Sequence, residues 1–134
     1  MSAENVDRAE RAYAAFNEGD VPSVVEHFDP DIAWSASDVF FDEPRAYRGR
    51  SEWTEAFLRE LMELFEDYRA DPEEIIDADD HLVAIVRVGG HGRSSGAMVT
   101  ARVAHVIEFR DGRISSFTEF KDVDEALRAA GMSE

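Results

Sequence analysis

The clearest pattern in the chain lies at residues 97–122, which read AMVTARVAHVIEFRDGRISSFTEFKD. Two runs rich in β-branched and aromatic residues flank the pair Asp111-Gly112, and such a pair between two such runs is a strong hairpin signal. Because side chains alternate across a strand, His105 shares one face with Ile107 and other apolar residues. We predict a central hairpin with one histidine on an otherwise apolar face.

The second run of this hairpin carries a carboxylate on the same face as a large aromatic residue. Alternation places Phe117, Glu119 and Lys121 on one face and Ile114 on the opposite face. In the first run, the face that carries His105 is mostly apolar, so we expect that face to turn towards the interior.

The spacing brings the histidine and the carboxylate close together. A regular register about the turn places Glu119 opposite Ala104 and one step diagonal from His105, and a bulge would shift this pairing. A buried carboxylate would stabilise the imidazolium and orient the ring, making His105 a general acid or base assisted by Glu119. The alternative is a structural histidine bonded to Glu119 or to a backbone carbonyl.

Composition indicates one folded domain and disfavours two classes of binding partner. The chain has 134 residues, 44% of them apolar and 33% charged, which suits a single domain over residues 1–134. A net charge of −16 disfavours binding to nucleic acid or to an anionic membrane surface. The sequence contains no long apolar span and no secretory signal pattern, so we expect a cytoplasmic protein.

The remaining sequence alternates between helical and strand patterns. Helical spacing of apolar residues predicts helices over residues 5–17, 20–28 and 52–67 and from 122 to 131, with Asp20 and Ser51 as N-caps. Strands are expected over residues 32–36, 68–78 and 81–89, the second of them at a sheet edge because of Pro72. Residues 37–50 and 89–96 are expected to be loops. The first loop is rich in aromatic residues, so we expect it to cover part of the protein interior.

This order predicts an α+β fold in which three to four helices pack on one face of a curved antiparallel sheet. The central strands are apolar on both faces, so the outer face needs a partner or stays exposed. We expect a homodimer through that outer face.

Several common catalytic and metal-binding motifs are absent from the sequence. There is no Gly-x-Ser-x-Gly elbow, no His-Glu-x-x-His pair and no cysteine, and the four histidines have no metal-ligand spacing. We therefore expect neither a metal site nor a cofactor.

Several motifs resemble the nuclear transport factor 2-like superfamily, specifically its SnoaL-like polyketide cyclase and ketosteroid isomerase-like branch. They are YAAFNEGD at 13–20, FDPDIAW at 28–34, YRG at 47–49, FRDGRI at 109–114 and EFKD at 119–122. The resemblance covers nearly the whole chain. It implies a cone-shaped sheet around a pocket that in this family hosts isomerases, cyclases, hydrolases, dehydratases and non-catalytic binders.

The resemblance also shows where this chain departs from a ketosteroid isomerase. The position of the general-base aspartate is occupied by Ala36, and that of the oxyanion tyrosine by Ala12, with Tyr13 one place away. The position of the carboxylic acid that stabilises the oxyanion in a ketosteroid isomerase is occupied by His105. These differences argue against steroid isomerisation.

The predicted site combines the two lines of reasoning. The catalytic residues are His105 and Glu119. The residues expected to contact a small apolar molecule in the pocket are Tyr13, Trp34, Trp53, Phe57, Val86, Val103, Phe117 and Lys121.

Three functions follow as hypotheses. The first is acid–base isomerase, cyclase or lyase chemistry on an apolar carbonyl compound, with His105 moving the proton. The second is a non-catalytic module that binds a small molecule or serves as a dimerising accessory protein. The third and weakest is epoxide-hydrolase-like water activation, because Arg102 falls on the face opposite His105.

Overall fold

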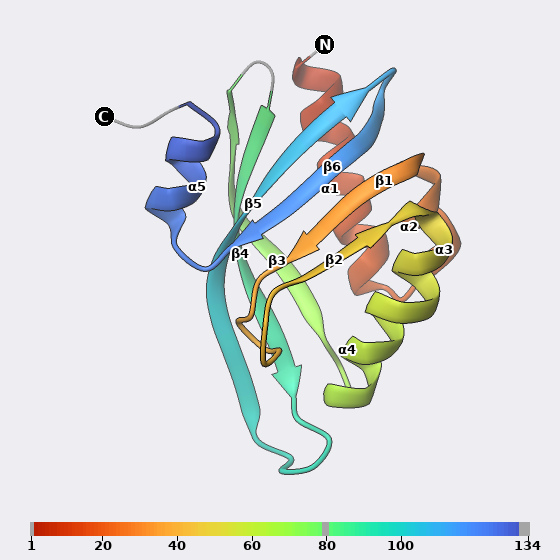
Figure 1. Ribbon diagram of the computed structural model, residues 1–134, viewed down its shortest axis with the longest axis vertical. Helices are drawn as coiled ribbons and strands as arrows, with labels where there is room; N and C mark the ends of the chain where they lie inside the picture. The colour runs from red at the N-terminus through yellow and green to blue at the C-terminus, as the bar shows by residue number, and fades with distance from the viewer. Residues whose placement is uncertain (1, 79–80, 132–134) are drawn as a thin grey trace.

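The computed structural model describes residues 2–78 and 81–131, and it contains one six-stranded sheet (Figure 1). The outermost residues of the predicted domain, Met1 and 132–134, lie outside the described part. The strands follow the order β2-β1-β6-β5-β4-β3. Their bounds are β1 Phe28–Ala36, β2 Arg45–Arg48, β3 Arg69–Asp77, β4 His81–His91, β5 Met98–Arg110 and β6 Arg113–Phe120.

Helices cover both faces of this curved sheet. Those on the concave face are α1 Ser2–Asn17, α2 Val21–Glu26 and a continuous segment formed by α3 Gly49–Glu52, the π-helical turn η1 Trp53–Leu58 and α4 Arg59–Leu64. The last helix, α5 Val123–Ala129, lies on the other side of the sheet, as Figure 1 shows. The predicted α+β fold with a curved sheet is therefore confirmed.

The central hairpin forms as the Asp-Gly signal predicts. Strands β5 and β6 are antiparallel, and both Asp111 and Gly112 have the positive φ angles, 53° and 79°, that a tight hairpin turn requires. A bulge then adds Ser115 to β6, because Glu108 pairs with Ser116. The extra residue shifts the register by one.

This bulge corrects two predictions. His105 lies directly opposite Glu119, instead of one step diagonal from it. Ile114 is buried in the core on the concave face of the sheet, whereas the regular alternation placed it on the opposite face. Both changes follow from one residue, since each single step in a strand reverses the direction of the side chain.

The strands differ from the predictions mainly at their ends. The segment predicted as the loop 37–50 contains the short strand β2, and β4 continues two residues beyond Gly89 to His91. The strand with Pro72 is at the sheet edge, as predicted, and a bulge follows the proline. Strand β1 starts at Phe28 and pairs with β6 in parallel, so the sheet is mixed and not wholly antiparallel.

The helix predicted for residues 52–67 begins and ends earlier. It starts at Gly49 and ends at Leu64, so Ser51 is not its N-cap. The carboxylate of Glu52 instead accepts the backbone N–H of Arg48 at 2.7 Å. The N-cap predicted for the second helix is confirmed, because the Asp20 side chain accepts the backbone N–H of Ser23.

The outer face of the sheet is partly covered by α5. Ala126 of this helix is fully buried in a small cluster with Val83, Ala104 and Val106. Beyond the helix, Arg102 and Arg87 both bind the carboxylate of Glu73. The apolar part of this face therefore has a partner within the chain, and the homodimer stays a prediction.

Candidate functional site

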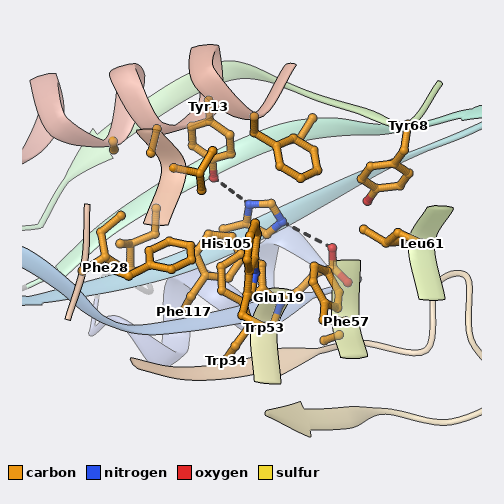
Figure 2. Close-up of a pocket in the computed structure, with 18 residues that line it drawn as sticks. Tyr13, Phe28, Trp34, Trp53, Phe57, Leu61, Tyr68, His105, Phe117 and Glu119 are labelled. Atoms are coloured by element: carbon orange, nitrogen blue, oxygen red, sulfur yellow. Dashed lines mark hydrogen bonds and ion pairs between the residues drawn. The ribbon is translucent and has the colours of Figure 1, made fainter. Parts of the chain in front are cut away.

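A cavity of about 60 Å³ lies between the concave face of the sheet and helices α1 and α3–α4 (Figure 2). Aromatic and aliphatic side chains form most of its wall, as in most small-molecule sites. Seven predicted site residues line it: Tyr13, Trp34, Trp53, Phe57, His105, Phe117 and Glu119.

The other three predicted contact residues do not line the cavity. Val86 and Val103 pair with each other and are completely buried in the core. Alternation placed them on the correct face but could not show where along it the cavity lies. Lys121 follows the end of β6, and its ammonium group binds the carboxylate of Asp38 at 2.7 Å outside the cavity.

Three side chains form a hydrogen-bonded chain at the cavity wall. The phenol oxygen of Tyr13, from α1, lies 2.6 Å from Nδ1 of His105 on β5. Nε2 of His105 lies 3.3 Å from Oε2 of Glu119 on β6. The predicted contact between His105 and Glu119 therefore exists, and Tyr13 extends it to a third residue, as Figure 2 shows.

Burial and hydrogen bonding set the charges in this chain. Burial raises the pKa of the Tyr13 phenol well above its ordinary value, and the negative charge of Glu119 raises it further. Burial also raises the pKa of Glu119, but hydrogen bonds from His105 and Ser37 outweigh that effect and lower the pKa overall. At neutral pH we therefore expect a protonated tyrosine and an ionised carboxylate.

The ionised carboxylate determines which imidazole nitrogen carries a proton. A carboxylate only accepts hydrogen bonds, so Nε2 of His105 must donate to Glu119. In the neutral imidazole Nδ1 then accepts the O–H of Tyr13. If His105 is protonated, Nδ1–H donates to Tyr13 instead and the phenol proton becomes free for another acceptor.

Ser37 holds the other oxygen of the same carboxylate. Oε1 of Glu119 accepts the Ser37 hydroxyl at 2.6 Å and its backbone N–H at 3.1 Å. Ser37 starts the loop that precedes β2, where no sequence pattern marked it as part of a site. In that loop the ring of Phe40 packs against Phe65 and Tyr68, so the aromatic loop does cover the core.

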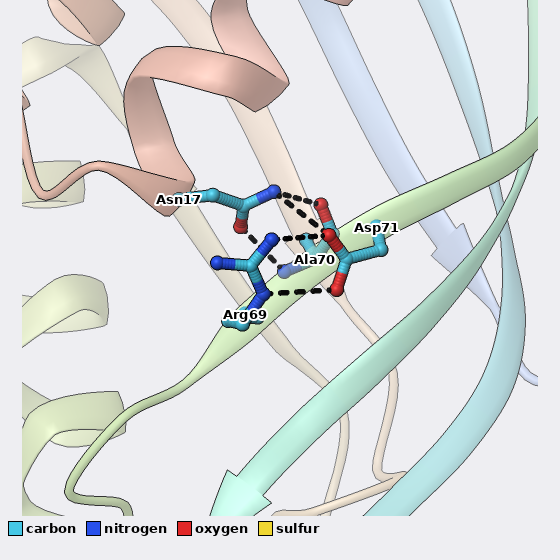
Figure 3. Close-up of polar contacts among 4 residues, drawn as sticks. All are labelled: Asn17, Arg69, Ala70 and Asp71. Atoms are coloured by element: carbon cyan, nitrogen blue, oxygen red, sulfur yellow. Dashed lines mark hydrogen bonds and ion pairs between the residues drawn. The ribbon is translucent and has the colours of Figure 1, made fainter.

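The helix that carries Tyr13 is fixed to the sheet by its last residue. The side-chain amide of Asn17 donates to the carbonyl of Ala70 and accepts the N–H of Ala70, both at 2.9 Å (Figure 3). The same amide donates to Asp71, whose carboxylate also binds Arg69. Asn17 thus pairs with the edge strand β3 as a neighbouring strand would and holds α1 over the cavity.

Residues 2–78 and 81–131 contain neither a candidate metal cluster nor a candidate membrane span. Within those ranges no group of three or more acidic or histidine side chains could hold a metal ion. None of the helices described there is both long and apolar enough to cross a membrane.

The family model of the SnoaL-like domain matches residues 9–117 of the chain. The comparison with curated proteins gives no match. Among solved structures, the fold is similar to that of a nuclear transport factor 2-like protein of unknown function from Burkholderia pseudomallei. That protein is 25% identical with a TM-score of 0.78, and the match covers 96% of this chain and 97% of that chain.

Two further structures are similar to this chain. A nuclear transport factor 2-like protein from Burkholderia thailandensis is 26% identical with a TM-score of 0.79, over 95% of this chain and 96% of that one. A putative polyketide cyclase from Sinorhizobium meliloti is 22% identical with a TM-score of 0.66, over 84% and 93%. The sequence match spans most of the chain and the structures share its architecture. The chain therefore belongs to the SnoaL-like domain family and has the nuclear transport factor 2-like fold.

Proposed function

We propose that the cavity performs acid–base chemistry of the isomerase, cyclase or lyase type on a small apolar carbonyl compound. The observation that carries this proposal is the chain from Tyr13 through His105 to Glu119 in an otherwise apolar wall. The fold alone supports many functions, including non-catalytic ones, so the proposal rests on these side chains.

Tyr13 is the group that would exchange a proton with the substrate. Both nitrogens of His105 are already bonded, one to Tyr13 and one to Glu119, so His105 acts through the phenol. The phenol oxygen takes a proton from the carbon next to the carbonyl while its own proton passes to Nδ1 of His105. The C–H electrons go into the enolate, and the carboxylate of Glu119 stabilises the imidazolium.

Return of the proton to a different carbon completes an isomerisation. A cyclase or a lyase would use the same enolate to form or break a bond at its neighbouring carbon. In this scheme the proton reaches His105 through Tyr13, whereas the hypothesis from the sequence has His105 itself moving the proton.

The test follows exchange of the protons next to the carbonyl of cyclopentanone in D2O by proton NMR. A positioned acid–base group contributes about 10²- to 10⁴-fold, so Tyr13→Phe and His105→Ala should lower the rate by that factor. Tyr47→Phe is the matched control, because the Tyr47 phenol also binds a carboxylate, that of Glu60, but outside the cavity. Full activity in both site variants would refute the proposal.

A binding module without turnover is the second candidate, because both nitrogens of His105 and both carboxylate oxygens of Glu119 already have partners within the chain. Native mass spectrometry would distinguish the two functions. A ligand that co-purifies and is recovered unchanged, together with no exchange catalysed by the wild-type protein, would support the binding module.

A further inference from the structure

The cavity has a fourth titratable side chain that the proposed chemistry does not use. Tyr13, His105 and Glu119 form the hydrogen-bonded chain. Tyr68 also lines the cavity, but its hydroxyl has no hydrogen-bond partner within the part of the chain that the structure describes. Among those residues, the one fully buried side-chain nitrogen or oxygen without a partner is the indole nitrogen of Trp53. The Tyr68 oxygen is therefore not enclosed by protein atoms and borders open space.

The hydroxyl of Tyr68 is turned towards the cavity. The residue lies between α4 and β3, and Figure 2 shows its oxygen directed towards the side chains around the cavity and not away from them. Burial raises the pKa of this phenol well above its ordinary value, and the negative charge of Glu119 raises it further. The phenol is therefore protonated at neutral pH, and Tyr68 presents an O–H donor to the cavity.

The surrounding residues fix the position of this donor. The ring of Phe16 stands perpendicular to that of Tyr68, with centroids 5.9 Å apart, and the ring of Phe65 lies 5.2 Å away. The carboxylate of the preceding residue, Asp67, accepts the backbone N–H of His91 at 2.6 Å and lies 2.8 Å from its Nδ1. A donor that is held in place before the ligand binds needs little reorganisation when charge develops on the ligand.

We propose that the Tyr68 hydroxyl donates a hydrogen bond to the carbonyl oxygen of the ligand and, during the reaction, to the oxygen of the enolate. This inference rests on the proposed function in taking the cavity as the site of a carbonyl compound. The two phenols then have separate roles. The O–H of Tyr13 is bonded to His105, so its oxygen accepts the proton from carbon, whereas the O–H of Tyr68 is available to the ligand oxygen. Because the bond strengthens as that oxygen gains negative charge, it would stabilise the enolate more than the ketone.

Tyr13 is the competing donor. If His105 is protonated, its Nδ1–H donates to Tyr13, and the phenol proton of Tyr13 becomes available to the ligand. A hydroxyl of Tyr68 that binds only water is the other alternative. The experiment must therefore report on each phenol separately.

Carbon NMR of labelled tyrosine separates the phenols. The chain has three tyrosines, Tyr13, Tyr47 and Tyr68, so a carbon-13 label at Cζ, the carbon that carries the hydroxyl, gives three signals. Tyr13→Phe and Tyr47→Phe assign two of them and leave the third to Tyr68. We expect cyclopentanone to move the Tyr68 signal and methylenecyclopentane, which has the same shape but a CH₂ group in place of oxygen, to leave it nearly in place. Tyr47 is the internal control, because its phenol binds Glu60 outside the cavity.

The variant Tyr68→Phe gives a second measure, because it removes the hydroxyl and keeps the ring. One hydrogen bond corresponds to about a threefold to tenfold change in affinity, so cyclopentanone binding should weaken by that factor. Binding of methylenecyclopentane should stay within about twofold. The rate of proton exchange at saturating cyclopentanone should fall further, by about 10²- to 10³-fold, as for other preorganised donors to an oxyanion. Tyr47→Phe should change none of these values.

Several outcomes would overturn the role of Tyr68. They are equal shifts of its signal with both probes, a shift of the Tyr13 signal alone, equal weakening of both probes in Tyr68→Phe, and a wild-type protein that does not bind cyclopentanone. If Tyr68→Phe fails to fold, the labelled wild-type protein still decides.

The two proposals can fail separately. If the ketone-specific shift of Tyr68 is present but the wild-type protein does not catalyse exchange, the acid–base proposal fails and the hydrogen bond from Tyr68 to the ligand stands. If exchange is catalysed but neither the signal of Tyr68 nor its replacement has an effect, the role of Tyr68 fails and the acid–base proposal stands.

Discussion

Replacement of Glu119 by glutamine should reverse the hydrogen bond between Tyr13 and His105. The amide oxygen of Glu119→Gln can still accept both donors of Ser37, which leaves the amide NH₂ facing Nε2 of His105. Two donors cannot bond to each other, so the imidazole proton must move to Nδ1. Nδ1–H then donates to the oxygen of Tyr13, and the phenol proton turns away from His105.

The stability loss can be estimated from the bonds that change. A hydrogen bond to a charged acceptor contributes about 1.5–3 kcal/mol, against about 0.5–1.5 kcal/mol for a neutral one. The two bonds from Ser37 therefore each lose about 1 kcal/mol, and only 11% of the Glu119 side chain is exposed to screening by water. We expect the free energy of unfolding at pH 7 to fall by about 2 kcal/mol.

The same carboxylate makes this difference depend on pH. Since the pKa of Glu119 is lowered in the folded protein, its charged form stabilises the fold fully above the ordinary value of 4.5. That contribution disappears as the pH falls through the lower, folded-state pKa. The stability gap between wild type and Glu119→Gln should therefore narrow below pH 4.5.

Urea unfolding at several pH values measures the gap, and nitrogen NMR of the imidazole identifies which nitrogen is protonated. Glu108→Gln is the matched control, because Glu108 faces His81 at 3.2 Å across β4 and β5 but is half exposed. Exposed pairs contribute little, so the control should change stability by less than about 0.5 kcal/mol. A proton that stays on Nε2 of His105 in Glu119→Gln, or a gap independent of pH, would refute the reasoning.

Two further predictions concern the frame around the cavity. Asn17→Ala removes both bonds to the backbone of Ala70 and should lower the free energy of unfolding by about 2 kcal/mol. Glu18 is the next residue and is exposed, so Glu18→Ala should change the free energy of unfolding little. Equal urea midpoints for the two variants would contradict this prediction. Gly89→Ala should destabilise by about 3 kcal/mol or more, because its Cβ would lie 2.0 Å from the carbonyl oxygen of Val99 at a φ of 140°. Gly96 also has a positive φ, but a Cβ there would meet no atom within 4 Å, so Gly96→Ala should lower the free energy of unfolding by only about 1–2 kcal/mol. Thermal unfolding measures both variants, and a similar loss of stability in the two would count against the clash at Gly89.

Strand alternation predicts part of the site. It places Phe117 and Glu119 on one face of β6, and helical spacing turns Tyr13 and Trp53 inwards. These predictions succeed because each depends only on the period of a single strand or helix, whereas the common face of His105 and Glu119 also needs the bulge at Ser115. The resemblance to the SnoaL-like family provides the arrangement of those elements, which the family match confirms.

Features that depend on several segments could not be predicted in this way. The bulge at Ser115 follows from how β5 and β6 fit together, and no glycine or other local signal marks it. Ser37 joins the site because β1 runs parallel to β6 and ends beside Glu119. The hydrogen bond between Tyr13 and His105 needs α1 to lie over the sheet, an arrangement that neither segment determines alone.

Glu119 binds Ser37 with one carboxylate oxygen and His105 with the other. The covering loop and the imidazole therefore share a single negative charge, and their states are thermodynamically linked. Release of Ser37 removes two donors from the carboxylate and strengthens its attraction for a proton on His105. By reciprocity, a substitution that weakens the contact between His105 and Glu119 changes the hold of the carboxylate on Ser37 by the same coupling free energy.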